Sequence, residues 1–145
     1  MLRPRHFPAP FALSVLAVLQ GTISIATAFA AETDRPLTFN RDIRPILSEN
    51  CYHCHGFDAG TRKGKRRLDI FEGAIAEREG VRAIVPGNLN ESELWQRIGS
   101  RHEDEVMPPP DSHKTLTAEQ KEKLRRWIEA GAVYEPHWAF VPPPD

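Results

Sequence analysis

The chain has 145 residues and a formal net charge of −1, so it is long enough for one ordinary domain with a core and hardly for two. The near-zero charge provides no overall attraction to nucleic acid or to an anionic membrane surface. Its 13 prolines include the runs MPPP and VPPP, which exclude helices and central strands there and predict loops or chain ends.

The first thirty residues have the plan of a secretory signal peptide. A basic start, MLRPRH, is followed by the largely apolar or small stretch FALSVLAVLQGTISIATAFA, with small residues at Ala28 and Ala30. This pattern predicts export, cleavage after Ala30 and a periplasmic location. An uncleaved membrane anchor is the alternative, because Phe11 to Ala30 is about long enough to span a bilayer. Cleavage would remove Arg3 and Arg5 and leave 17 basic and 20 acidic residues, a charge of −3.

A first helix is expected to begin with Asn40 or Asp42 as its N-cap. Pro45 falls near the first turn, where a missing N–H costs little. The helical spacing of apolar residues predicts a buried face formed by Ile43, Ile46 and Leu47. This helix runs directly into the two cysteines.

The only two cysteines, Cys51 and Cys54, stand in the stretch ENCYHCHGFD with a histidine directly after the second. A structural disulfide between them would close a tiny loop and stabilise little. A thioredoxin-like redox pair would need a preceding strand and a βαβ pattern, which the sequence lacks. A zinc site would draw its other ligands, at no recognisable zinc spacing, from His53, His55, His102, His113 or His137.

Cys-x-x-Cys-His is the attachment signal of c-type haem, and this interpretation uses all three residues at once. On helical spacing Cys51 and Cys54 face the same side, and His55 follows one turn after Cys51. The stretch therefore predicts one covalently attached haem c. Cys51 and Cys54 would bind the two vinyl groups, and His55 would be an axial ligand of the iron. A haem-free thiol protein is the alternative.

Met107 is the only methionine after the signal peptide, and a haem iron usually takes a sixth ligand. It stands in EDEVMPPPDS, where Pro108 to Pro110 hold the backbone in a stiff, nonhelical path. A methionine that fills a core would more naturally lie on an amphipathic helix. His102 and His113 flank this loop and are the rival ligands, although their charged and polar neighbours are typical of solvated histidines.

Two later helices are expected from capping boxes. Asn90 with Glu93 predicts a helix that runs to about Gly99, with an inward face of Leu94, Trp95 and Ile98. Thr117 with Gln120 predicts a last helix, stopped by Gly131, with an apolar stripe of Leu124, Trp127 and Ile128. We expect the tryptophans in the core rather than as electron conduits, since both lie at helical spacing among aliphatic residues.

Five basic side chains occupy the six positions from Arg62 to Arg67, RKGKRR. Two interpretations stay open: a docking patch for an acidic partner or a counter-charge to the haem propionates, and a solvated surface loop. Export argues against a role with nucleic acid. Glu103 to Glu105 form a patch of opposite charge beside Met107.

Several motifs occur together and in order: FNRDIRPILSENCYHCHGFD, RRLDIFEGA, IVPGNLNESELWQRI, MPPP, LTAEQKEKLRRWIEAGA and HWAFVPP. With them the chain, from Leu37 to about Pro143, resembles the planctomycete-type cytochrome c domain. The resemblance implies an all-α, cytochrome c-like fold, a small helical domain wrapped around one covalently bound haem, with the last helix packed across the first. It implies that the haem is held by Cys51, Cys54, His55 and Met107.

The resemblance also implies a domain organisation. We expect a signal peptide over 1–30, a short linker over 31–36, the haem domain over 37–134 and a proline-rich tail or linker over 135–145. In that family the cytochrome module usually opens a longer protein, so the chain is either a natural single-domain product or a truncated one.

Two function classes follow. The first is an electron carrier, in which protein fills both axial positions of the iron. The second is a haem module of a larger exported enzyme, which serves as redox partner or as gas or redox sensor. Such a module would need an open or easily vacated position at the iron. Methionine as the sixth ligand favours the carrier. We expect no catalytic residues, redox partner proteins, no nucleic acid, and no stable membrane insertion if the signal peptide is cleaved.

Overall fold

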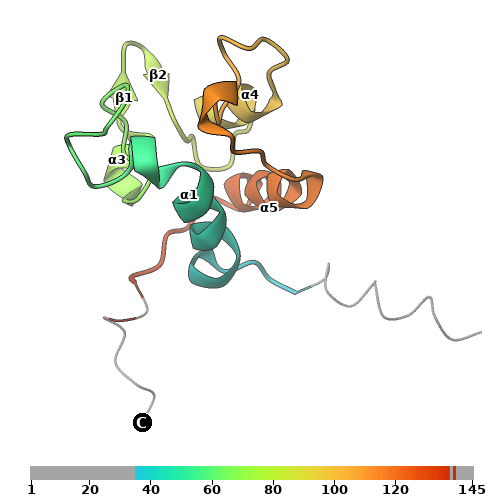
Figure 1. The fold of residues 1–145 in the computed structure, drawn as a ribbon. Helices are drawn as coiled ribbons and strands as arrows, with labels where there is room; N and C mark the ends of the chain where they lie inside the picture. The colour runs from blue at the N-terminus through green and yellow to red at the C-terminus, as the bar shows by residue number, and fades with distance from the viewer. Residues whose placement is uncertain (1–34, 138, 140–145) are drawn as a thin grey trace, which may run out of the picture. The chain divides into compact units, whose positions relative to one another are not determined.

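The computed structural model describes residues 35–137 and 139 (Figure 1). The chain divides at Arg35, and the unit from Pro36 onward holds the described helices and strands. The predicted signal peptide and its cleavage site lie outside the described residues. None of the helices in the described part of the chain combines the length and the apolar character needed to cross a membrane.

The first helix begins with a π-helical turn, η1 (Phe39–Ile43), and continues as α1 (Arg44–Asn50). It starts earlier than expected, because Thr38 is the N-cap and the two predicted caps, Asn40 and Asp42, lie inside the helix. The Asp42 carboxylate instead accepts a hydrogen bond of 2.8 Å from the backbone N–H of Thr38. This N–H is one of those near the helix start that have no helical carbonyl as a partner. The predicted apolar face is confirmed by the burial of Ile43, Ile46 and Leu47.

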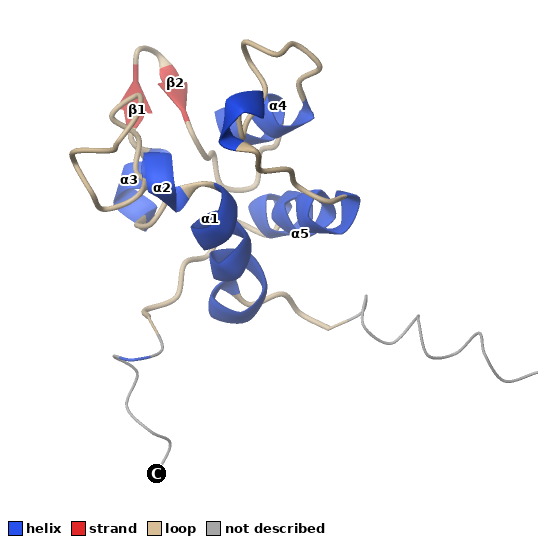
Figure 2. Cartoon of the chain, in the orientation of Figure 1, coloured by secondary structure: helices blue, strands red, loops and turns tan. Residues whose placement is uncertain are grey.

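Short elements follow the first helix. α2 (Tyr52–His55) comes directly after Cys51, and α3 (Phe71–Ile75) precedes an antiparallel hairpin of β1 (Glu77–Arg78) and β2 (Val81–Arg82) (Figure 2). Both residues of the hairpin turn have positive φ, 54° and 81°, as a tight two-residue turn requires. The domain is therefore mainly helical, and the all-α expectation missed this hairpin because two-residue strands are too short for an alternating pattern.

α4 (Glu93–Gly99) ends at the predicted glycine, but Asn90 does not cap it. Ser92 is the N-cap residue, and its buried hydroxyl donates backward to the carbonyl oxygen of Asn88 at 2.7 Å. The Glu93 carboxylate pairs with two arginines, so the predicted capping box does not form. The inward face is as expected, with Leu94 and Ile98 buried and Trp95 partly buried.

A 3-10 turn, η2 (Pro110–Ser112), leads toward the last helix, α5 (Ala118–Glu129). Its predicted capping box is confirmed: Thr117 Oγ1 accepts from the backbone N–H of Gln120 at 3.1 Å, and Gln120 Oε1 accepts from that of Thr117 at 2.9 Å. Gly131 follows the helix end with φ of 101°, the left-handed conformation that ends many helices. The predicted stripe is buried, with Leu124, Trp127 and Ile128.

α5 packs beside η1, and α4 packs beside α5 (Figure 1). The ring of Phe39 lies 5.6 Å from that of Trp127 and 4.3 Å from that of Tyr134, measured between ring centroids. These aromatic contacts join the first helix to the last and to the segment after it. Trp127 is only 4% exposed, so it belongs to the core, as predicted. The largest fully buried apolar side chains are Phe39, Ile43, Leu47, Ile84, Leu124 and Ile128.

Candidate functional site

Cys51, Cys54 and His55 lie on one helical turn where α1 meets α2. The carbonyl oxygen of Cys51 accepts hydrogen bonds from the backbone N–H of Cys54 at 3.1 Å and from that of His55 at 2.8 Å. This turn gives the three side chains the spacing of helical neighbours. All three residues are half-buried, and the two thiols are not joined in a disulfide.

Burial shifts the pKa values of two side chains at this turn. It raises the pKa of the Cys51 thiol to about 12 and lowers the pKa of the His55 imidazole, an effect that the nearby backbone of Lys63 partly offsets. Among the described residues, His55 Nδ1 is buried and has no hydrogen-bond partner. Neutral imidazole is the form in which histidine binds a metal.

The loop over 56–68 folds back onto the same turn. The backbone N–H of Lys63 donates to the carbonyl oxygen of Cys54 at 2.7 Å, and that of Leu68 donates to the carbonyl oxygen of His55 at 2.7 Å. Two carbonyls that a helix this short leaves unpaired are thereby satisfied. The loop therefore fixes the backbone of Cys54 and His55.

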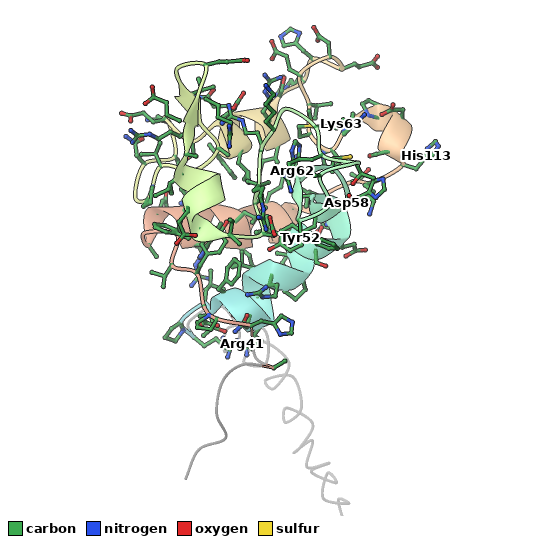
Figure 3. All side chains as sticks on the ribbon, turned by 90° about the vertical axis from the view of Figure 1, so that its left-hand side faces the viewer. Arg41, Tyr52, Asp58, Arg62, Lys63 and His113 are labelled. Carbon is green, nitrogen blue, oxygen red and sulfur yellow. The ribbon has the colours of Figure 1, made fainter. Side chains whose placement is uncertain are left out.

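Arg62 closes the first part of this loop. Its guanidinium donates to the carbonyl oxygens of Gly56 at 3.0 Å and Phe57 at 2.6 Å. Asp58 completes the turn by accepting from the backbone N–H of Gly60 at 2.8 Å, a bond that lowers the pKa of its carboxyl. Figure 3 shows Arg62 and Asp58 on the same part of the domain.

The basic run divides into two groups. Its arginines are engaged: Arg62 holds the loop, Arg66 pairs with Glu93, and Arg67 pairs with Asp69. Lys63 and Lys65 are exposed and have no ion pair with the described residues. The sequence did not reveal this division, because the partners of Arg66 and Arg62 lie outside the run.

Met107 belongs to a separate loop that is anchored on α4. Its backbone N–H donates to the carbonyl oxygen of Arg97 at 3.1 Å, its side chain is half-buried, and the bond to Pro108 is cis. The rival ligands His102 and His113 are exposed. Figure 3 shows His113 at the edge of the domain, with its ring directed outward.

Tyr52, between the two cysteines, has a buried hydroxyl without a hydrogen bond to the described residues. Two surface grooves lie elsewhere: one of about 710 Å³ beside Tyr134 and one of about 580 Å³ beside Trp127. Neither is lined by the predicted haem residues. In the described part of the chain, no group of three histidine, cysteine or carboxylate side chains is arranged so that it could hold a metal ion.

Comparison with known proteins gives one match. Residues 51–111 match the family model described as Planctomycete cytochrome C. No curated protein and no solved structure matches the chain. The matched stretch begins at Cys51 and includes Cys54, His55 and Met107.

Proposed function

We propose that this chain, which carries a planctomycete-type cytochrome c domain, is an exported monohaem c-type cytochrome that transfers single electrons. Haem-binding electron transfer is the function that the family indicates. The observation that carries the finer proposal is the helical turn that holds Cys51, Cys54 and His55, with His55 Nδ1 buried and without a hydrogen-bond partner among the described residues.

The residues of this turn fit haem c. Cys51 and Cys54 are unpaired thiols, and each S–H would add across one vinyl C=C of the porphyrin, so that a thioether forms and no atom is lost. His55 would present a neutral nitrogen to the iron, because burial lowers its pKa. When bound, haem supplies an iron that alternates between the ferric and ferrous states.

Met107 is the proposed sixth ligand. Its loop is tied to α4 by the hydrogen bond to Arg97, and it is half-buried while His102 and His113 are exposed. With both axial positions filled by protein, the iron would exchange electrons without binding a substrate. The alternative is a haem module of a larger exported enzyme, as redox partner or as gas or redox sensor, in which the sixth position is open or easily vacated.

The proposed site of action is the periplasm, on the basis of the signal-peptide pattern. The proposed partners are redox proteins with an acidic docking surface. The exposed lysines Lys63 and Lys65 support this, because Lys63 is bonded through its backbone to Cys54. Phe57, two residues after His55, is 79% exposed on the same loop as the two lysines, which Arg62 holds in place, so that loop also offers an apolar contact.

The test is a pyridine haemochrome assay on the full chain, produced with a periplasmic haem-attachment system. We expect a c-type spectrum, one haem per chain, and haem that stays with the protein in acidified acetone. Cys51→Ser and Cys54→Ser should each lower the retained haem, while Ser48→Ala, an exposed position on the preceding helix α1, should not. Haem that acidified acetone extracts from the wild type would overturn covalent attachment.

A further inference from the structure

Glu93, the first residue of α4, binds two arginines at once. Its Oε2 lies 2.7 Å from an Arg66 guanidinium nitrogen, and its Oε1 lies 3.2 Å from one of Arg97. The side chains are 22% exposed for Glu93, 14% for Arg66 and 39% for Arg97. Ion pairs shielded to this degree are screened less by salt than pairs on an open surface.

Arg66 connects this network to the Cys-x-x-Cys-His turn. It belongs to the loop whose backbone bonds to the carbonyl oxygens of Cys54 and His55 through Lys63 and Leu68. The backbone N–H of Arg66 donates to the carbonyl oxygen of Lys63 at 3.2 Å. A displacement of Arg66 therefore acts on a segment bonded directly to the turn.

Arg97 connects the network to the Met107 loop. Its carbonyl oxygen accepts from the backbone N–H of Met107 at 3.1 Å, and its guanidinium donates to the carbonyl oxygen of Glu105 at 3.4 Å. Arg97 thus holds Met107 through the Arg97 backbone, and it holds the segment before Met107 through the Arg97 side chain.

We propose that Glu93 is a positioning residue that ties the loop of the Cys-x-x-Cys-His turn to the Met107 loop through Arg66 and Arg97. The path of hydrogen bonds and ion pairs runs from Cys54 and His55 through the loop to Arg66, across Glu93 to Arg97, and on to Met107. His55 and Met107 stand at opposite ends of this path. The positioning concerns the chain itself, and only its effect on the iron rests on the proposed function.

Glu93→Gln tests the proposal in the haem-loaded full chain, because it removes the charge and keeps the size. Hydrogen exchange of the Met107 amide, followed by NMR, reports directly on the bond to Arg97. We expect exchange roughly tenfold faster than in the wild type, the size of effect that coupling within one ion-pair network produces. Glu122→Gln is the matched control, since Glu122 pairs with Arg125 on the exposed side of α5, and it should leave Met107 exchange unchanged.

Arg66→Gln removes the ion pair between Arg66 and Glu93 and leaves the pair between Glu93 and Arg97 intact. It also removes the hydrogen bond of 3.1 Å from the Arg66 guanidinium to the carbonyl oxygen of Val81. It should reproduce the faster exchange, and it serves as the test if Glu93→Gln does not fold. The rate of carbon monoxide binding to the ferrous protein is the second readout. In both variants it should rise by a similar factor, because Met107 would have to leave the iron before carbon monoxide binds. Unchanged Met107 exchange in the folded variants overturns the positioning role. Rapid carbon monoxide binding by the wild type overturns Met107 ligation instead. The hydrogen-exchange result then still decides whether Glu93 positions the Met107 loop.

Discussion

The backbone amide of Leu68 donates a hydrogen bond of 2.7 Å to the carbonyl oxygen of His55. This bond closes the loop that begins at Gly56 and returns the chain to the Cys-x-x-Cys-His turn. The return requires a tight path directly after His55. A Cβ placed on Gly56 would lie 2.3 Å from the carbonyl oxygen of Tyr52, which is backbone and cannot rotate away.

Gly56→Ala should therefore destabilise the folded protein. Relief of the contact requires a shift of the backbone beside His55, and overpacking of this kind costs about 1–3 kcal/mol. Gly99→Ala is the matched control, because a Cβ there meets nothing within 4 Å and alanine favours the helical conformation. Urea unfolding of both variants measures the difference. Equal stability of Gly56→Ala and the wild type would contradict the steric argument.

Tyr52→Phe and Tyr134→Phe should differ in their effects on stability. The buried hydroxyl of Tyr52 has no hydrogen bond to the described residues, so its removal should be neutral or stabilise by up to about 1 kcal/mol. The hydroxyl of Tyr134 donates to the carbonyl oxygen of Leu68 at 3.0 Å, so its loss should cost about 1 kcal/mol. Both free energies come from urea unfolding at neutral pH, and a larger loss for Tyr52→Phe would reverse the assignment.

Tyr52 should also shape the alkaline stability of the protein. Burial raises its pKa to about 12 from the ordinary value of 10.0. The phenol therefore ionises first in the unfolded chain, and the stability linked to its neutral form is present below pH 10 and lost as the pH rises from 10 to 12. The unfolding free energy of Tyr52→Phe should fall less steeply than that of the wild type across this range. Parallel curves would show that the phenol is not buried in solution.

Local signals explain which parts of the fold were predictable. The capping box of Thr117 and Gln120 involves residues three apart, so the sequence alone specifies it. The apolar stripes of the helices follow from the same short spacing. Asn90 and Glu93 show the same spacing but form no box, because Ser92 is the N-cap and Glu93 pairs with Arg66 and Arg97 instead. The contact with Arg66 comes from another part of the chain, which the local spacing does not show.

Long-range contacts also explain what the sequence left undecided at the site. The basic run appeared uniform, yet Arg62 and Arg66 have structural partners while Lys63 and Lys65 face solvent. The early start of the first helix at Phe39 involves a local contact instead, because the Asp42 carboxylate bonds back to the backbone N–H of Thr38, four residues before it. The assignment of Cys51, Cys54, His55 and Met107 to a haem stays a prediction, which the haemochrome assay tests.

Neutralising Lys63 and Lys65 should weaken docking to an acidic redox partner. In the double variant Lys63→Gln/Lys65→Gln, electron transfer should be slower at low salt and less dependent on salt, because exposed charges attract over only about 8 to 10 Å near physiological ionic strength. Lys121→Gln/Lys123→Gln on α5 changes the net charge equally and is the control. Stopped-flow rates across a salt series measure both, and identical rates in the two variants would leave the solvated-loop interpretation of the run.

Met107→Ala decides between the electron carrier and the sensor or enzyme module. A thioether favours ferrous iron, so its loss should lower the reduction potential, remove the weak long-wavelength band of Met-bound ferric haem and let carbon monoxide bind readily. Met107→His should keep a six-coordinate, low-spin iron at a lower potential than the wild type, because imidazole replaces the thioether.

His102→Ala and His113→Ala are the controls, and neither should alter the band. Redox titration and visible spectra with and without carbon monoxide measure these changes. A wild-type protein that lacks the band, or that binds carbon monoxide as readily as Met107→Ala, would leave His102, His113 or an open position at the iron and would favour the sensor or enzyme module.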